Sequence, residues 1–199
     1  FREERELNDR LKDDLRKIYW EVQSNIQNIE NIIRKNKTYS KHEEDLLMII
    51  NGDAEYDFGR VVNIIDSIRW PTFFGETTAY SASVSSGRFN TSKEDSLVRN
   101  ISLLYEHYFI RLNLNGEILD KKAFEFSSEH SEHFNKARFN QQKVDTLGLN
   151  KYFFSNDFHN GLLGAYEIRK DYYMKRLDDT KNQLQKVKLI YDNSYFKSF

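Results

Sequence analysis

The chain has 199 residues, with 30 lysines and arginines against 31 aspartates and glutamates, so its formal net charge at pH 7 is -1. No basic face stands out, which argues against a nucleic acid as the main partner. The absence of cysteine excludes thiol catalysis, disulfide bonds and zinc–thiolate sites. No apolar run of about 18 residues is present, so no segment is predicted to span a membrane.

The first three dozen residues predict one long helix, from about residue 2 to about 36. Apolar residues recur every three or four positions and form a single stripe between polar side chains. The stripe consists of Leu7, Leu11, Leu15, Ile18, Val22, Ile26, Ile29 and Ile33. It repeats every eleven residues, about 3.67 per turn, which favours a straight bundle helix over a two-stranded coiled coil.

Shorter helices are predicted next. Ser40 and Glu43 fit a capping box, which predicts a second helix that ends at Asn51-Gly52. A third helix is predicted over about 55–69, where Trp70-Pro71 ends it because a residue before proline disfavours the helical conformation.

Residues 72–75 are predicted to be a connector. Thr77 or Thr78 is expected to begin a short helix of small residues, and Gly87 is expected to end it in a left-handed conformation.

The second half of the chain predicts two more long helices, over about 92–126 and 157–196. Asn115-Gly116 is a possible kink in the first of them. The second shows a heptad pattern in which Lys170 and Thr180 are the polar members of the seam.

Residues 127–155 are predicted to be a loop-rich connection, in which Tyr152-Phe153-Phe154 forms a short extended piece. Ser155 or Asn156 is expected to cap the final helix.

Together these elements predict an all-α fold. It is an elongated helical bundle with three long helices (about 2–36, 92–126 and 157–196) and a cap of short helices. We expect residues 1–199 to form a single helical domain. Because Phe1 is not a natural start, we also expect that a segment upstream has been removed.

Two stretches resemble a family of uncharacterised bacterial proteins. The first is the charge run Arg2-Glu3-Glu4-Arg5-Glu6 with the helix that follows, and the second runs from Thr78-Ala79-Tyr80 to Ser86-Gly87-Arg88-Phe89, followed by a helix that carries Leu104-Tyr105 and Tyr108. The likeness covers about the first 110 residues. The family has one N-terminal membrane helix and a domain of unknown function. The resemblance therefore implies a helical domain on the extracytoplasmic (periplasmic) side of an inner membrane, the alternative being the cytoplasm, and it implies no activity.

One cluster has the residue types of a metal site. Glu129, His130 and His133 would lie close together on a helix, and imidazole and carboxylate are zinc ligands. Asp157 and His159 are more distant candidates. The alternative is a solvated polar segment, which we favour because no catalytic zinc signature is present. We therefore expect no metal and no cofactor.

Aromatic and apolar residues of the later helices are candidates for a groove or an interface. They are Tyr80, Tyr166, Tyr173, Leu177, Leu184 and Tyr191. The alternative is that they pack in the core, as the heptad positions of the last helix indicate.

The sequence favours a non-enzymatic, membrane-tethered extracytoplasmic domain for protein interaction or self-association. The first alternative is a ligand-binding sensor domain that signals through an upstream membrane helix, and it requires an internal pocket with converging polar groups. A metal-dependent enzyme is a minor alternative.

Overall fold

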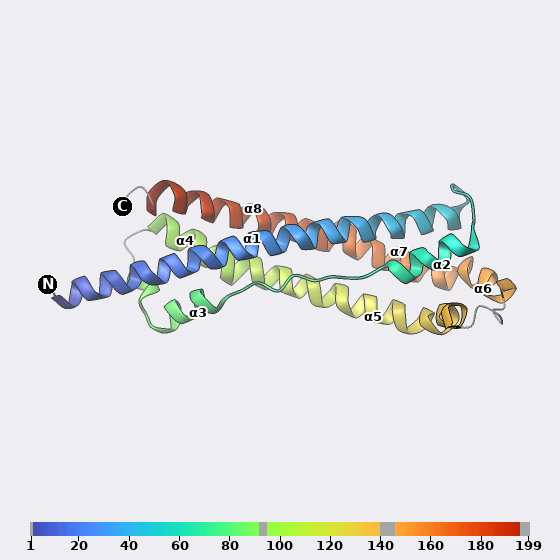
Figure 1. Cartoon of the computed structure of the whole chain (residues 1–199), viewed down its shortest axis with the longest axis horizontal. Helices are drawn as coiled ribbons and strands as arrows, with labels where there is room; N and C mark the ends of the chain where they lie inside the picture. The colour runs from blue at the N-terminus through green and yellow to red at the C-terminus, as the bar shows by residue number, and fades with distance from the viewer. Residues whose placement is uncertain (1, 92–94, 140–145, 196–199) are drawn as a thin grey trace. The chain divides into compact units, whose positions relative to one another are not determined.

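The computed structural model describes residues 2–91, 95–139 and 146–195. Over these residues the chain is helical and has no strand, which confirms the prediction of an all-α helical bundle (Figure 1). The α-helices are α1 (Arg2–Asn51), α2 (Phe58–Ser67), α3 (Thr78–Ser85), α4 (Asp95–Leu103), α5 (Phe109–Phe139), α6 (Thr146–Phe153), α7 (Asn156–Glu167) and α8 (Met174–Ile190). No helix among the described residues is long and apolar enough to cross a membrane.

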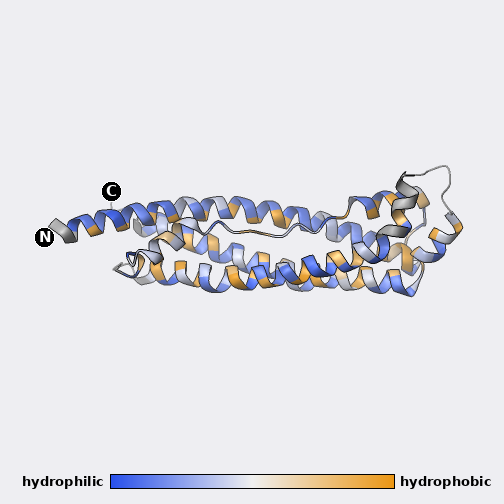
Figure 2. Cartoon of the chain, turned by 90° about the horizontal axis from the view of Figure 1, so that it is seen from below, coloured by the Kyte–Doolittle hydropathy of each residue, from blue (hydrophilic) through white to orange (hydrophobic). Residues whose placement is uncertain are grey.

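The chain divides into two compact units. Unit 1 contains Phe1–Ile32, Phe73–Leu114 and Arg176–Phe199, and unit 2 contains Ile33–Thr72 and Asn115–Lys175. Apolar residues recur along helices that are otherwise hydrophilic (Figure 2). Each unit buries such residues in its own interior, as expected for amphipathic helices.

The interior of unit 1 is built from α1, α4, the start of α5 and α8. Its fully buried apolar residues include Ile18, Val22, Ile29, Leu97, Ile101, Leu104, Leu112, Leu177, Leu184, Val187 and Tyr191. The predicted stripe of α1 is buried at six of its eight positions, whereas Ile26 is half-buried and Leu7 is exposed. The buried members are Leu11, Leu15, Ile18, Val22, Ile29 and Ile33.

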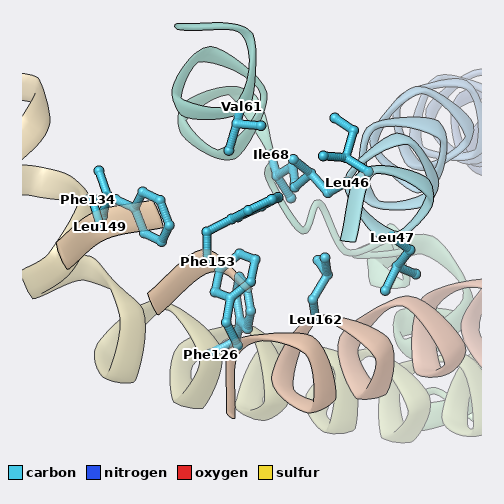
Figure 3. Packing of buried hydrophobic residues seen from close by; sticks show 11 residues of the cluster. Leu46, Leu47, Val61, Ile68, Phe126, Phe134, Leu149, Phe153 and Leu162 are labelled. Atoms are coloured by element: carbon cyan, nitrogen blue, oxygen red, sulfur yellow. The ribbon is translucent and has the colours of Figure 1, made fainter. Parts of the chain in front are cut away.

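The interior of unit 2 contains a cluster of aliphatic and aromatic side chains that point toward one another (Figure 3). The residues labelled there come from α1, α2, the chain just after α2, and α5 to α7. They are Leu46, Leu47, Val61, Ile68, Phe126, Phe134, Leu149, Phe153 and Leu162.

The predicted break before Ser40 is wrong, because α1 continues without interruption to Asn51. Glu43, expected at the start of a second helix, is instead wholly buried and binds Arg169. The end of the helix is as expected, since Gly52 follows it with a φ of 82°.

Several other boundaries follow their local signals. Gly87 has a φ of 75° after α3, and the Ser155 side chain accepts a hydrogen bond from the Phe158 amide at the start of α7. Thr77 lies at the N-cap of α3 but makes no capping bond. The Glu21 carboxylate replaces it and accepts from the amides of Ala79 and Tyr80, at 2.7 and 3.4 Å.

The prediction of a loop-rich segment over residues 127–155 is wrong for its described part. Helix α5 extends to Phe139 and passes through Asn115-Gly116 without a break, and α6 contains Tyr152 and Phe153. The expected start of the long helix at residues 92–94 lies outside the described residues. The prediction of one domain over residues 1–199 stays a prediction.

Two π-helical turns lie inside the long helical segments, at Leu104–Tyr108 and Ile168–Tyr173. A π turn inserts one residue and rotates the helix faces beyond it. Lys170, predicted in the seam, is therefore exposed, and Arg169 is buried in its place.

Residues 68–77, which we call the strap, connect α2 to α3 without helical structure. Side chains of α1 bind its backbone. In unit 1, Asn25 bonds to both the amide and the carbonyl of Glu76, each at 2.8 Å. In unit 2, Asn36 Nδ2 donates to the Pro71 carbonyl at 2.9 Å. These bonds satisfy backbone groups that a chain outside a helix leaves unpaired.

Candidate ligand pocket

Unit 2 contains a pocket of about 380 Å³. One wall comes from the second half of α2 and the start of the strap, and the other from one face of α5. The lining residues are Val62, Ile65, Asp66, Ile68, Arg69, Trp70, Phe126, Ser127, His130 and Phe134. A mostly apolar cavity of this size with a few polar groups at its edge is typical of a small-molecule site.

Trp70 forms part of the pocket wall and stands directly before Pro71, where a residue disfavours the helical conformation. Its ring meets Phe126 edge-on at 6.0 Å between centroids. The Arg169 guanidinium carbon lies 5.7 Å from the centroid of the Trp70 ring, within the range of a cation–π contact.

Arg69 lies at the rim, just after the end of α2. Its Nη1 donates to the carbonyls of Asp66 and Ile68, at 2.6 and 2.7 Å. Both carbonyls lie at the end of the helix, where the backbone acceptors lack helical partners. The side chain is exposed, but these two bonds determine the direction of its guanidinium group.

The backbone of Arg69 is held by the side chain of Arg169, which is wholly buried. Arg169 Nη2 donates to the Arg69 carbonyl at 2.8 Å, and its Nη1 donates to Asn36 Oδ1 at 2.6 Å. Its Nε and Nη2 bind the two carboxylate oxygens of Glu43 at 2.8 and 3.0 Å. A paired charge of this kind stabilises the pocket wall only while every partner is present.

His130 is buried beside the pocket, among the rings of Phe126 and Phe158, at centroid distances of 4.5 and 5.2 Å. Its Nδ1 shares a hydrogen bond with the Tyr152 hydroxyl. Burial lowers the pKa of His130, and the Glu129 carboxylate opposes this shift. His130 Nε2 has no hydrogen-bond partner among the described residues, and a methyl group on Gly161 would lie 2.8 Å from it.

The candidate metal ligands Glu129, His130 and His133 do not converge on one point. His133 is exposed and stacks on the Tyr152 ring at 3.7 Å, whereas His130 binds the hydroxyl of the same tyrosine. Glu129 is exposed, with Oε2 at 3.7 Å from His130 Nε2. Within the described part of the chain, no group of three metal-ligating side chains is found.

Tyr80 is buried in unit 1, where its ring stacks on Tyr105 at 4.3 Å with an angle of 10° between the planes. Its hydroxyl donates to Glu106 at 2.5 Å, and the Tyr105 hydroxyl donates to Glu21 at 2.7 Å. Burial, with the acceptor carboxylate of Glu106, raises the pKa of Tyr80 to about 12. These contacts fasten α3 to the π turn Leu104–Tyr108, and that turn to α1.

The other groove candidates lie mainly inside the chain. Tyr173, Leu177, Leu184 and Tyr191 are wholly buried, and Tyr166 is half-buried against the apolar cluster of unit 2. None of them lines the pocket described above.

Sequence reasoning missed the pocket residues other than His130. The sequence predicts Trp70 only as the end of a helix, and the apolar faces of α2 and α5 do not indicate that a pocket lies between them. The one available signal was an aromatic residue directly before the single proline of the chain, which fixes a large side chain beside a helix end.

Comparison with known proteins gives a family and no activity. No curated protein and no solved structure matches the chain significantly. One family model matches residues 2–160, and its description is a family of unknown function. This match extends beyond the 110 residues on which the resemblance was based. The chain belongs to this family of unknown function, DUF6090.

Proposed function

We propose that this chain is a non-enzymatic domain that binds a small apolar molecule in the pocket of unit 2, as the sensing part of a membrane-tethered protein. The observation that supports ligand binding is the pocket itself, with apolar walls on both sides and Arg69, Asp66 and His130 among its lining. A sensor needs an internal site of this kind. The tether and the extracytoplasmic side are proposed from the resemblance of the charged start of α1 to a segment that follows a membrane helix.

Ligand binding is tested with a neutral apolar fluorophore, N-phenyl-1-naphthylamine. Trp20, which is 61% exposed in unit 1, is first replaced by phenylalanine so that Trp70 is the remaining tryptophan. We expect saturable binding with energy transfer from Trp70. Val62→Phe fills the pocket and should weaken binding roughly tenfold, because a bulky ring removes the space that the probe needs.

Val98→Phe is the matched control, since Val98 is also half-buried but lies on α4 in unit 1. This variant should bind the probe like the parent chain. Absence of saturable binding, or equal weakening by both substitutions, contradicts the proposal. The tether is tested separately with a topology reporter fused after residue 199 of the full-length protein, and a cytoplasmic signal contradicts the proposed location.

A second candidate function is protein interaction or self-association. Ile110 and Leu114 lie one turn apart on α5 in unit 1 and are 52% and 54% exposed. Apolar side chains in this arrangement are suited to a helix partner. Native mass spectrometry tests this candidate: a dimer that Ile110→Lys converts to a monomer supports it, and a monomer at all concentrations contradicts self-association.

A further inference from the structure

The rim of the pocket carries charges that bear on the class of ligand. Among the described residues that line the pocket, Arg69 is the only lysine or arginine and Asp66 is the only acid. Asp66 already interacts within the chain. Burial lowers the pKa of His130, which favours the neutral form of this histidine.

The guanidinium group of Arg69, a residue of the pocket lining, uses only one of its three nitrogens in hydrogen bonds to the described part of the chain. Nη1 directs its two hydrogens to the carbonyls of Asp66 and Ile68. In the described part of the chain no hydrogen bond of Nε or Nη2 is found. These two nitrogens form the edge that binds both oxygens of a carboxylate in a planar, bidentate pair.

The volume of the pocket sets the size of the apolar part of a ligand. An apolar cavity of about 150 Å³ accommodates benzene. A space of about 380 Å³ is more than twice as large and has room for a chain or ring system of roughly ten carbon atoms. Its walls offer aliphatic and aromatic side chains and few polar atoms.

We propose that the pocket binds a monocarboxylic acid of medium chain length, with its hydrocarbon part between α2 and α5 and its carboxylate on the Nε–Nη2 edge of Arg69. This assignment rests on the proposed function, because it requires the pocket to hold a ligand. Asp66, one turn before Arg69, disfavours a second negative charge on the ligand.

The test compares three ligands with the same chain and different head groups: decanoate, 1-decanol and decylamine. Binding is followed by the fluorescence of Trp70 in the Trp20→Phe chain, below the critical micelle concentrations of decanoate and decylamine and below the solubility limit of 1-decanol. We expect decanoate to bind roughly tenfold or more tightly than 1-decanol, because a charge-assisted bidentate pair adds to the same apolar contact.

Arg69→Gln should weaken decanoate binding by about the same factor and leave 1-decanol binding unchanged. Arg69→Lys should fall between them, because it keeps the charge and loses the planar fork. Arg60→Gln is the matched control: Arg60 is exposed on α2 and does not line the pocket, so decanoate binding should not change. Far-ultraviolet circular dichroism verifies that each variant is folded.

The outcomes separate the two proposals. If the pocket binds N-phenyl-1-naphthylamine but none of the three compounds, the proposed function stands and the carboxylate assignment is wrong; if neither the fluorophore nor the three compounds bind, the proposed function is wrong as well. If 1-decanol binds as tightly as decanoate, or Arg69→Gln leaves decanoate binding unchanged, the pocket binds ligands but the carboxylate assignment is wrong. Preference for decylamine also overturns the assignment and points to Asp66 as the group that binds the head.

Discussion

The buried arginine of unit 2 gives the sharpest prediction about stability. Arg169 and Glu43 are both wholly buried, and Arg169 makes four hydrogen bonds, two of them to the Glu43 carboxylate. Arg169→Met keeps an unbranched apolar stem but leaves Glu43 without a cation. Breaking one side of a buried ion pair costs about 3–5 kcal/mol. We expect a loss of that size in the free energy of unfolding.

The assay is urea unfolding at pH 7, followed by far-ultraviolet circular dichroism. Glu43→Met should destabilise the chain comparably, because it strands the arginine charge. The double variant should lose less than the sum of the two single losses, since it retains neither charge. Asp13→Asn is the control: Asp13 and Lys17 form an ion pair at 2.7 Å, but their side chains are 49% and 62% exposed, so no measurable loss is expected.

A loss below about 1 kcal/mol for Arg169→Met would refute the reasoning, because it would mean that Glu43 is not left with an unpaired buried charge. Additive losses in the double variant would refute it as well. In that case the two residues would contribute independently, and the wall under Arg69 would not depend on their pairing.

Three further predictions follow from single positions. Gly116→Ala in α5 should raise the free energy of unfolding by about 0.5–1 kcal/mol, since the added methyl meets Thr72 and Tyr173 at ordinary contact distances of 3.6–3.7 Å. Gly161→Ala in α7 should lower the free energy of unfolding by about 1 kcal/mol in the same urea assay, because its methyl would lie 2.8 Å from His130 Nε2. Asn25→Ala should lower the free energy of unfolding by about 2 kcal/mol, because Asn25 is wholly buried and binds both backbone groups of Glu76. Asn28→Ala removes one exposed hydrogen bond to the Phe74 carbonyl and should lower it by less than about 1 kcal/mol. Equal losses in free energy of unfolding would contradict the role of burial. The pKa of His130 is lower in the folded chain than its ordinary value of 6.5, so on acidification the unfolded chain takes up a proton on this histidine before the folded chain does. The free energy of unfolding should therefore keep its full value above pH 6.5 and fall as the pH drops through 6.5 toward the folded pKa. His130→Asn should flatten this part of the profile of urea midpoint against pH, and substitution of the exposed His107 by asparagine should not.

Local sequence signals predicted the helix ends that depend on one residue. Gly52 and Gly87 adopt the left-handed conformation that ends a helix, and Ser155 caps α7. The capping-box pattern at Ser40 failed for a reason that lies far away in sequence. Glu43 has its partner at Arg169, and the buried pair favours a continuous α1 over a new helix start.

The polar seam of the last long helix shows a second limit. Strict heptad spacing placed Lys170 inside, but the π turn at Ile168–Tyr173 brings Arg169 to the buried face. A π turn shifts the register of the helix by a single residue, and so small a shift leaves no recognisable change in the hydrophobic periodicity of the sequence. The predicted seam was correct again from Tyr173 onward, where Leu177, Thr180 and Leu184 are buried.

The segment that resembles the family now has a physical explanation in unit 1. Tyr80 stacks on Tyr105 and meets the buried Phe89 edge-on at 5.2 Å, Ser83 donates to Asp14 at 3.1 Å, and Gly87 supplies the turn between them. The three contacts of Tyr80 and Ser83, together with the turn at Gly87, fasten the short helix α3 in place. These contacts account for the residues of the resemblance by the positions that they hold in unit 1.

The pocket was beyond sequence reasoning because its walls are positioned by residues that do not touch its interior. Asn36 holds the carbonyl of Pro71, and Arg169 holds the carbonyl of Arg69, so the strap is fixed on both sides of Trp70 through its backbone. Such bonds do not depend on which side chains the strap carries. Substitution of Asn36 or Arg169 should therefore alter ligand binding, although neither residue lines the pocket. The side chains of the strap indicate which ligand the pocket binds only when these two residues hold its backbone in place.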